Sequence, residues 1–314
     1  MPNISITNSA EFVKTQKTVE KAAEIKLKAA EISRALSDSY TDRGKLVKAQ
    51  EISDCGTYLV FKEWRDPGQT ATLHGANFCK DTLCPMCAWR RHLKYSAIIS
   101  EVLRTNKQRY IYHIVLAIRN TPFVDKALLM HLKERGKSFI KQKLQLNDYI
   151  SNLECVVSDT GYHPHLHIIC TTNDYIGIDE YFIKILSLAW RRHFEKGGYI
   201  DNELADDKGY TIFIRGISRY KMSDEDLTSI SLELSKYVVK VDGVRGDYSY
   251  IGVLSESLKG VRKISAGGLL AQGMRAAKKS LSKERYDKLI SLQPYEWQYS
   301  IYNYINGIYE KKSN

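Results

Sequence analysis

The sequence predicts an α+β fold, in which strands and helices intermix without a regular βαβ repeat. Three observations lead to this prediction: helical spacing of apolar residues over 10–37, a strand-like run over 110–118, and two strand-like runs joined by a turn over 153–170. The chain has 314 residues, of which 43% are hydrophobic. This length and composition allow one large buried core or two smaller ones.

The N-terminal part is predicted to begin with an amphipathic helix over residues 10–37, docked on the body of the protein. Its apolar positions, separated by Lys and Glu, are Val19, Ala22, Ile25, Ala29, Ile32 and Leu36. A stretch punctuated by proline and glycine follows around 66–68, and a cysteine-rich segment comes after it.

A strand, a helix and a hairpin follow in the central part of the chain. Turn residues close the strand over 110–118, and a helix is expected over 125–146. The runs 153–157 and 165–170 flank the turn residues of 158–161, so they predict a β-hairpin. This hairpin contains the main motif of the chain.

Two further helices are expected beyond the hairpin, the first near 179–195. Ser223 and Asp226 form the pattern of a capping box, which opens the second helix. The apolar positions of this second helix are Leu227, Ile230, Leu234, Val238 and Val241. We therefore expect it to continue as far as Val241.

The charge balance points to a polyanionic partner. The chain has 47 Lys and Arg against 36 Asp and Glu, which favours nucleic acid, although such an excess can also serve solubility alone. No signal-peptide pattern and no apolar run of membrane-spanning length occurs, so we expect a cytoplasmic protein without a membrane partner. Its six cysteines would then be kept reduced.

The segment 163–167 contains three of the chain's eight histidines. His165 and His167 are two residues apart, so on a strand both imidazoles project from one face and can share a metal ion. Glu154 lies on the partner strand of the predicted hairpin, where side-chain alternation can aim its carboxylate at the same ion. Such a set with open positions suits Mn²⁺ or Mg²⁺ bound to a phosphate oxygen. The alternative is a hydrogen-bonded pair of core histidines.

The cysteines Cys79, Cys84 and Cys87 form a second candidate metal site, because three thiolates within nine residues suit one tetrahedral zinc ion. A structural zinc needs a fourth ligand, for which His74 and Cys55 are the candidates. We prefer His74, which lies five residues before Cys79. Free buried cysteines are the alternative.

Basic residues follow the cysteines and recur in a concentration over 258–288. We expect six of them to contact DNA, namely Arg90, Arg91, Lys94, Lys259, Arg262 and Lys263.

Glu233, Tyr237 and Lys240 lie at positions i, i+4 and i+7. In a continuous helix they would share one stripe, which can face one metal ion. The alternatives are a packing role for one tyrosine among 21 and a solvated helix face for Glu233 and Lys240.

These motifs, in this order, resemble the replication initiator (Rep) proteins of small bacterial rolling-circle plasmids, a branch of the HUH endonuclease superfamily. The matching segments span about 75–268 and are FCKDTLCPMCAWRRHLK, HIVLAIRN, LECVVSDTGYHPHLH, ELSKYVVK and LKGVRKISAGG. The resemblance implies an HUH-like antiparallel sheet flanked by helices. Thr82 stands where members of this family often have Arg, and Ala117 and Ile118 lie in a strand that often contains threonines in the family. These differences leave the DNA contacts of the two segments undetermined.

The resemblance also implies roles, residue by residue. His165, His167 and Glu154 match the metal-binding residues, Tyr237 matches the nucleophile, and Glu233 matches an acid one turn upstream. The implied activity is origin-specific nicking and strand transfer through a 5′-phosphotyrosine, with Lys240 favouring the phenolate. The implied cofactors are catalytic Mn²⁺ or Mg²⁺ and structural Zn²⁺.

We expect a helical, DNA-contacting region over 1–72, a zinc element and nuclease domain over 73–250, and a basic, aromatic-rich region over 251–314. One expected partner is single-stranded plasmid origin DNA. The other is a host helicase, because the glycines of 268–273 are not followed by the Lys and Ser or Thr of a P-loop, so the chain has no motif for ATP-driven unwinding. The oligomeric state stays open, with a dimer as one option. A relaxase or transposase of the same superfamily and a zinc-containing DNA-binding regulator are the alternatives.

Overall fold

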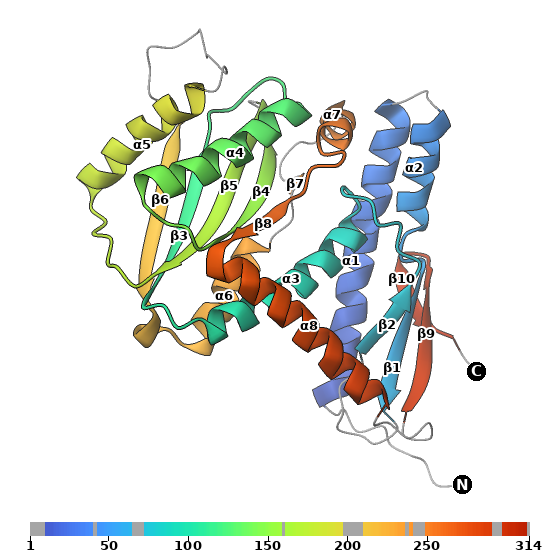
Figure 1. The fold of residues 1–314 in the computed structure, drawn as a ribbon. Coiled ribbons are helices and arrows are strands. Elements are labelled where there is room, and N and C mark those ends of the chain that lie inside the picture. Colours follow the sequence, from blue (N-terminus) through green and yellow to red (C-terminus); the bar gives the residue numbers. More distant parts are fainter. Residues whose placement is uncertain are drawn as a thin grey trace, which may run out of the picture. The chain divides into compact units, whose positions relative to one another are not determined.

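The computed structural model describes residues 10–39, 43–64, 72–158, 161–196, 210–235, 239–240, 249–290 and 297–312. The chain divides into two compact units, one formed by 1–89 with 282–314 and the other by 90–281. Each unit contains a largely antiparallel sheet together with helices, so the fold is α+β as predicted (Figure 1). The division differs from the expected boundaries at 72 and 250, since the cysteine segment belongs to the first unit.

The first unit contains a sheet that pairs strands far apart in the sequence. Its helices α1 (Ala10–Ser39) and α2 (Arg43–Asp54) pack together. Its strands, in the sheet order β10-β9-β1-β2, are β1 (Tyr58–Trp64), β2 (Thr72–Ala76), β9 (Trp297–Ile305) and β10 (Ile308–Lys311). The six predicted apolar positions between Val19 and Leu36 are all buried, which confirms the N-terminal amphipathic helix.

The second unit is built on a six-stranded sheet in the order β6-β3-β5-β4-β7, with β8 also paired to β4. The strands are β3 (Tyr110–Ala117), β4 (Tyr149–Ser158), β5 (Gly161–Thr172), β6 (Thr211–Ser218), β7 (Val239–Lys240) and β8 (Ile264–Gly267). Only the β4–β7 pair is parallel among these described strands. The predicted hairpin is formed by β4 and β5, which places the histidine strand at the centre of the sheet.

Within the described residues, seven helical elements belong wholly or partly to this unit. They are α3 (Pro85–Thr105), α4 (Lys126–Lys143), α5 (Glu180–Glu195), η1 (Arg219–Lys221), α6 (Asp224–Leu234), α7 (Ser249–Ser257) and α8 (Gly268–Ile290), of which α3 begins and α8 ends in the first unit. Among the helices that the structure describes, none has the combination of length and apolarity that crossing a membrane requires.

Helices α4 and α5 cover one face of the six-stranded sheet (Figure 1). Gly136 of α4 lies so close to the sheet that a Cβ atom there would meet Cδ2 of Leu166 at 2.5 Å. Trp190 of α5 is buried, and its Nε1 donates a hydrogen bond to the Ala117 carbonyl at 2.8 Å. These contacts fix the helices against β3 and β5.

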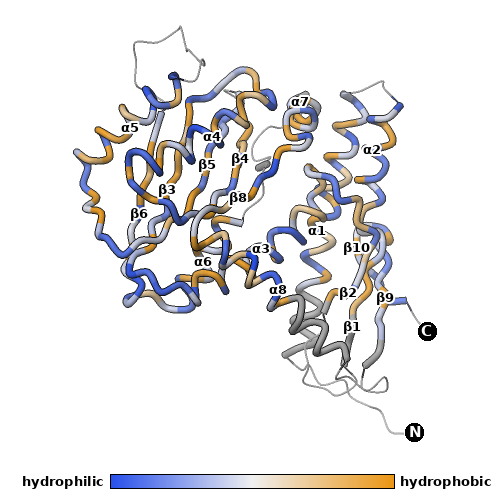
Figure 2. The backbone as a smooth tube through the Cα atoms, viewed as in Figure 1, coloured by the Kyte–Doolittle hydropathy of each residue, from blue (hydrophilic) through white to orange (hydrophobic). Residues whose placement is uncertain are grey.

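Helices α3, α6 and α8 cover part of the opposite face. Their buried residues pack in one cluster with Ile111 of β3, Ile150 of β4 and Ile169 of β5. Figure 2 shows hydrophobic residues interspersed with hydrophilic ones along these strands and helices. Side chains two residues apart on a strand share a face, so His113 and His167 lie on the same face as this cluster. This face of the sheet therefore has two parts. One is apolar and covered by helices, and the other is polar and contains the histidines.

The helix that opens at Ser223 is shorter than predicted. The capping box is present, with Ser223 Oγ accepting a hydrogen bond from the Asp226 N–H at 3.1 Å. However, α6 ends at Leu234, and Val239 lies in strand β7, paired with Cys155. The prediction of one continuous helix to residue 241 is therefore wrong. The β-branched Val239 favours a strand, and an open edge of β4 accepts it.

Candidate active site and metal centres

Glu154, His165 and His167 converge on one point in the second unit. Glu154 on β4 is the direct cross-strand partner of His165 on β5. Nε2 of His165 lies 2.9 Å from Oε2 of Glu154, and Nε2 of His167 lies 2.8 Å from the same oxygen. The register of the hairpin therefore brings together the three residues that the sequence predicted as metal ligands.

The Glu154 carboxylate is buried, with 3% of its surface exposed. Burial by itself raises the pKa of Glu154, but hydrogen bonds from His165 and His167 outweigh burial and lower this pKa to about 2. Its other oxygen, Oε1, is buried without a hydrogen-bond partner among the described residues. A buried carboxylate oxygen without a partner is costly unless another group binds it. The donor set and this oxygen fit a divalent cation.

The second ring nitrogen of each histidine also has a partner. Nδ1 of His165 lies 3.1 Å from the His163 carbonyl oxygen. Nδ1 of His167 lies 3.2 Å from Nε2 of His113, a residue of β3. His113 was not predicted from the sequence, because the pairing of β3 with β5 brings together residues 54 positions apart and has no local signal. Its alternation with Ile111 and Val115 could only place it on one face of its own strand.

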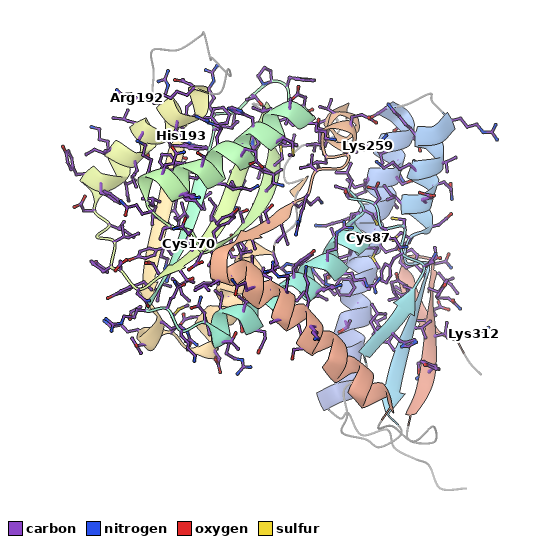
Figure 3. The ribbon with its side chains drawn as sticks, viewed as in Figure 1. Cys87, Cys170, Arg192, His193, Lys259 and Lys312 are labelled. Atoms are coloured by element: carbon purple, nitrogen blue, oxygen red, sulfur yellow. The ribbon has the colours of Figure 1, made fainter. Side chains whose placement is uncertain are left out.

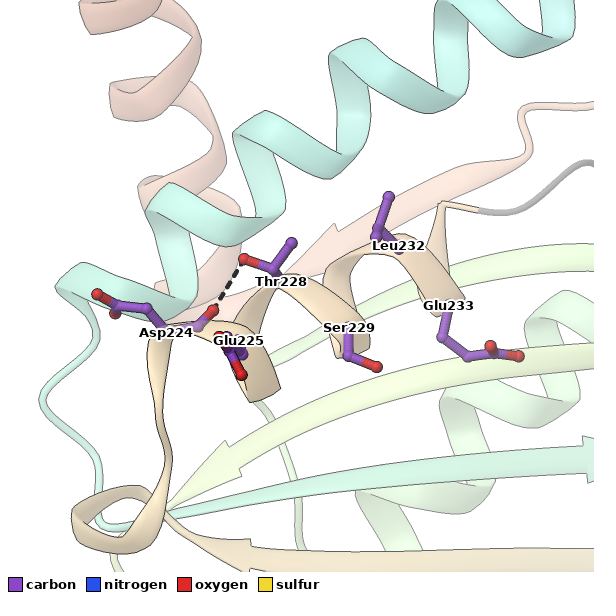
Figure 4. A pocket seen from close by; sticks show the side chains of 6 residues that line it. All are labelled: Asp224, Glu225, Thr228, Ser229, Leu232 and Glu233. Carbon is purple, nitrogen blue, oxygen red and sulfur yellow. Dashed lines mark hydrogen bonds between the residues drawn. The ribbon is translucent and has the colours of Figure 1, made fainter. Parts of the chain in front are cut away.

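The predicted stripe of Glu233, Tyr237 and Lys240 is not formed, because the described members lie on different elements. Glu233 is in the last turn of α6, and Lys240 ends β7, where its backbone pairs with Val156. Tyr237 lies outside the described residues. Glu233 lines a surface pocket of α6, drawn in Figure 4 together with Asp224, Glu225, Thr228, Ser229 and Leu232.

Four cysteines of the first unit form the second cluster, and none of them is in a disulfide. The Sγ atom of Cys87, labelled in Figure 3, lies 3.6 Å from that of Cys55 and 3.7 Å from that of Cys79. Cys84 completes the set, whose four sulfurs all lie within 4.8 Å of one another. Four sulfurs about 2.3 Å from a tetrahedral zinc ion are about 3.8 Å apart. The cluster therefore fits a structural zinc.

The fourth member of this cluster is Cys55, and the preference for His74 is corrected. His74 is exposed on β2, where its ring contacts that of Tyr299, with centroids 5.0 Å apart. Cys55 follows α2 directly, in a turn of the backbone, and its sulfur lies in the cluster. His74 is closer to Cys79 in the sequence, but it lies on β2, which pairs with β1, and it is not part of the cluster.

A buried lysine holds the backbone at Cys55. Lys26 of α1 is 4% exposed, and its Nζ donates hydrogen bonds to the carbonyl oxygens of Ser53 and Cys55, the latter at 2.8 Å. The spacing of Lys26 in the amphipathic helix next to buried Ile25 was visible in the sequence, but its partner was not.

The predicted DNA-contacting residues lie in two places. Arg90, Arg91 and Lys94 are on α3, of which Arg90 and Lys94 are exposed. Lys259, labelled in Figure 3, and Arg262 are exposed in the segment between α7 and β8. In the same segment, the Lys263 carbonyl accepts a hydrogen bond from the N–H of Leu153, next to Glu154, at 3.2 Å.

Comparisons with known proteins identify a family and relatives of this chain. The model of a family described as "Replication protein" matches residues 70–305. A protein named "Protein rep" from Bacillus amyloliquefaciens is 30% identical over 258 residues, which cover 72% of this chain and 71% of that protein. Proteins of the same name from Lactiplantibacillus plantarum and Streptococcus pneumoniae are 27% and 26% identical, over 72% and 77% of this chain and 73% and 76% of theirs.

No solved structure matches the chain at a significant level. The family match covers well over half of the residues, and its range contains His165, His167, Glu154 and three of the four clustered cysteines. The chain therefore belongs to the replication protein family, which confirms the resemblance to the Rep initiators of rolling-circle plasmids.

Proposed function

We propose that this replication protein is a metal-dependent endonuclease that nicks and rejoins one strand of plasmid origin DNA, with Tyr237 as its nucleophile. The observation that best supports the proposal is the convergence of two imidazoles and one buried carboxylate at His165, His167 and Glu154. Such a set can hold Mn²⁺ or Mg²⁺ and leave coordination positions for a phosphate oxygen.

In the first step, the phenolate oxygen of Tyr237 attacks the phosphorus of a phosphodiester in single-stranded origin DNA. A bond forms between the tyrosine oxygen and phosphorus, and the bond from phosphorus to the 3′ oxygen breaks. The leaving oxygen takes up a proton and becomes the 3′-hydroxyl that primes synthesis, while the 5′-phosphate stays on the tyrosine. When bound, the divalent ion supplies positive charge for the phosphate oxygens of the transition state.

Backbone pairing in the second unit supports the choice of Tyr237. Val239, two residues later in the sequence, pairs with Cys155, which is adjacent to Glu154. A free tyrosine titrates near about 10, so the site must favour the phenolate. Lys240 follows Tyr237 by three residues and ends β7, and a cation favours the charged form of a neighbouring phenol.

A later step ends the round of replication. A glutamate can take a proton from water but forms no lasting phosphodiester, so we assign Glu233 as the general base of the hydrolytic step. Water would lose its proton to the Glu233 carboxylate, its oxygen would bond to phosphorus, and the 3′ oxygen would leave.

The remaining features serve binding and folding in this proposal. The four cysteines hold a structural zinc, and the basic residues of α3 and of the segment before β8 contact the DNA backbone. A host helicase separates the strands, because the chain lacks a P-loop.

The test uses labelled single-stranded oligonucleotides tiled across the replicon that encodes the chain, incubated with the protein and Mn²⁺. We expect a covalent adduct on one oligonucleotide, and peptide mapping should locate it on Tyr237. Tyr237→Phe removes only the hydroxyl, so DNA binding should persist while the adduct disappears.

Tyr220→Phe is the matched control, because Tyr220 is an exposed tyrosine of the same unit with 82% of its surface accessible. An adduct of normal yield in Tyr237→Phe would refute the nucleophile. A wild-type protein that binds these oligonucleotides but never forms an adduct would favour the DNA-binding regulator. Reaction only with DNA outside the replication origin would favour the relaxase or transposase.

A further inference from the structure

The two metal-binding histidines are held by different kinds of group. Both rings direct Nε2 at the Glu154 carboxylate, and a ring that binds a metal ion through Nε2 must carry its proton on Nδ1. The partner of Nδ1 must then be able to accept a hydrogen bond. His165 Nδ1 contacts a backbone carbonyl of His163, which can only accept a hydrogen bond. That contact stabilises the tautomer of His165 with its proton on Nδ1, which is the form that can bind a metal through Nε2.

His167 has no such fixed acceptor. Its Nδ1 contacts Nε2 of His113, and an imidazole nitrogen accepts a hydrogen bond only when it carries no proton. If His113 carried its proton on Nε2, it would donate to His167 Nδ1, and the proton of neutral His167 would move to Nε2. In that tautomer Nε2 has no lone pair for a metal ion.

We propose that His113 is a positioning residue that holds the proton of His167 on Nδ1 and so keeps Nε2 of His167 available as a metal ligand. The inference rests on the proposed metal-binding role of His165, His167 and Glu154. It assigns to His113 a neutral tautomer with its own proton on Nδ1 and an unprotonated Nε2.

The surroundings of His113 hold its ring in place for this role. The rings of His113 and His167 are nearly parallel, with centroids 5.5 Å apart and an angle of 14° between their planes. On its other side, the ring of Phe213 from β6 contacts His113 edge-on, with centroids 6.2 Å apart. Because three neighbouring strands contribute these rings, the direction of the His113 Nε2 lone pair is fixed by the sheet.

Paired substitutions separate positioning from packing. His113→Gln retains an oxygen that can accept from His167 Nδ1, whereas His113→Phe retains the ring shape and removes the acceptor. We expect the Phe variant to bind Mn²⁺ about 10- to 100-fold more weakly, which is the range for loss of an outer-shell partner, and the Gln variant to recover most of this affinity. Titration calorimetry of the full chain with Mn²⁺ measures both.

The matched control is His131→Phe. His131 lies on α4, where its Nε2 contacts the Phe194 carbonyl at 2.9 Å, so it is a half-buried histidine outside the metal centre. Its replacement should leave the Mn²⁺ affinity unchanged. Equal affinity of His113→Phe and wild type would overturn the proposal, and so would equal weakening by the Gln and Phe variants.

A second measurement needs no variant and decides the matter if His113→Phe fails to fold. Nitrogen NMR of the imidazoles in wild-type protein loaded with Zn²⁺, a diamagnetic probe, reports which nitrogen carries each proton. We expect His167 to be bound through Nε2 with a proton on Nδ1, and His113 to be unprotonated at Nε2. A proton on His113 Nε2 would overturn the role of His113 alone, whereas absence of Mn²⁺ binding by the wild type would remove the metal centre itself.

Discussion

The two candidate metal centres differ in how the chain assembles them. Glu154, His165 and His167 come from the two strands of one hairpin, whereas the four cysteines come from separate places in the first unit. Three ligands leave coordination positions open, and four sulfurs leave none. The comparison indicates that the hairpin centre is suited to react with a substrate and the cysteine centre to hold the fold.

The two centres would also differ in net charge when a metal ion is bound. Two neutral imidazoles and one carboxylate leave a divalent ion with net positive charge, which attracts a phosphate. Four thiolates around zinc give a net negative charge, which repels one. The buried ammonium of Lys26, bonded to the Cys55 carbonyl, partly offsets that negative charge in the first unit.

The largest expected effect is on the three-ligand centre of Glu154, His165 and His167, called the open centre below, whereas the four-cysteine centre is called the closed centre. Replacing both His165 and His167 by Ala should abolish Mn²⁺-dependent cleavage of origin oligonucleotides, because only Glu154 would remain to hold the ion. EDTA should do the same to the wild type. Gel analysis of cleaved strands measures the loss, and the zinc content of the double variant should stay normal. Cleavage that survives chelation would contradict a metal-dependent mechanism.

Loss of the closed centre should act on stability first. Cys84→Ser should release zinc and lower the melting temperature by about 10 °C, because binding energy of the metal is part of the folding energy. Elemental analysis and calorimetry measure both quantities. Cys155→Ser is the matched control, since Cys155 is a buried free cysteine of the second unit outside the cluster. A zinc-free wild type of equal stability would leave the four cysteines as core residues.

A smaller effect distinguishes the two candidates for the fourth zinc ligand. Cys55→Ala should lower the zinc content, because the cluster includes this sulfur, while His74→Ala should leave it unchanged, because His74 is exposed beside Tyr299. Zinc retained by Cys55→Ala but lost by His74→Ala would reverse the assignment that the structure favours.

The sequence predicted the open centre more completely than the closed one. Glu154, His165 and His167 lie within a single hairpin, so strand alternation and a short turn determine their approach. Cys55 lies 24 residues before Cys79, and Lys26, which holds the Cys55 carbonyl, belongs to α1. These contacts depend on tertiary packing, which leaves no periodic signal in the sequence.

The same distinction explains the errors in the fold. The helix at 10–37, the hairpin and the capping box at Ser223 were predicted because each depends on local spacing. The end of α6 depends on a distant partner, since β4 offers an edge to Val239. The helical spacing of Val238 and Val241 therefore predicted a longer helix than the chain forms. The role of His113 was invisible for the same reason.

The smallest expected effect concerns Glu233, which lines the α6 pocket and is not one of the three converging ligands. If Glu233 activates water, Glu233→Gln should still form the Tyr237 adduct and transfer strands, because the tyrosine and the metal ligands are unchanged. Only hydrolytic release of the second product should slow. The measurement is a time course with two successive oligonucleotides, in which adduct formation and release are scored separately.

Glu225→Gln is the matched control, because Glu225 is an exposed glutamate of the same helix and the same pocket (Figure 4). It should leave both steps intact and change the free energy of unfolding by no more than about 0.5 kcal/mol. If the Glu233 and Glu225 variants behave alike, Glu233 is an ordinary helix-surface residue and another group must activate the water. If Glu233→Gln instead slows the first cleavage and needs more Mn²⁺, then Glu233 belongs to the open metal centre. In that case Glu233 does not act in the hydrolytic step alone.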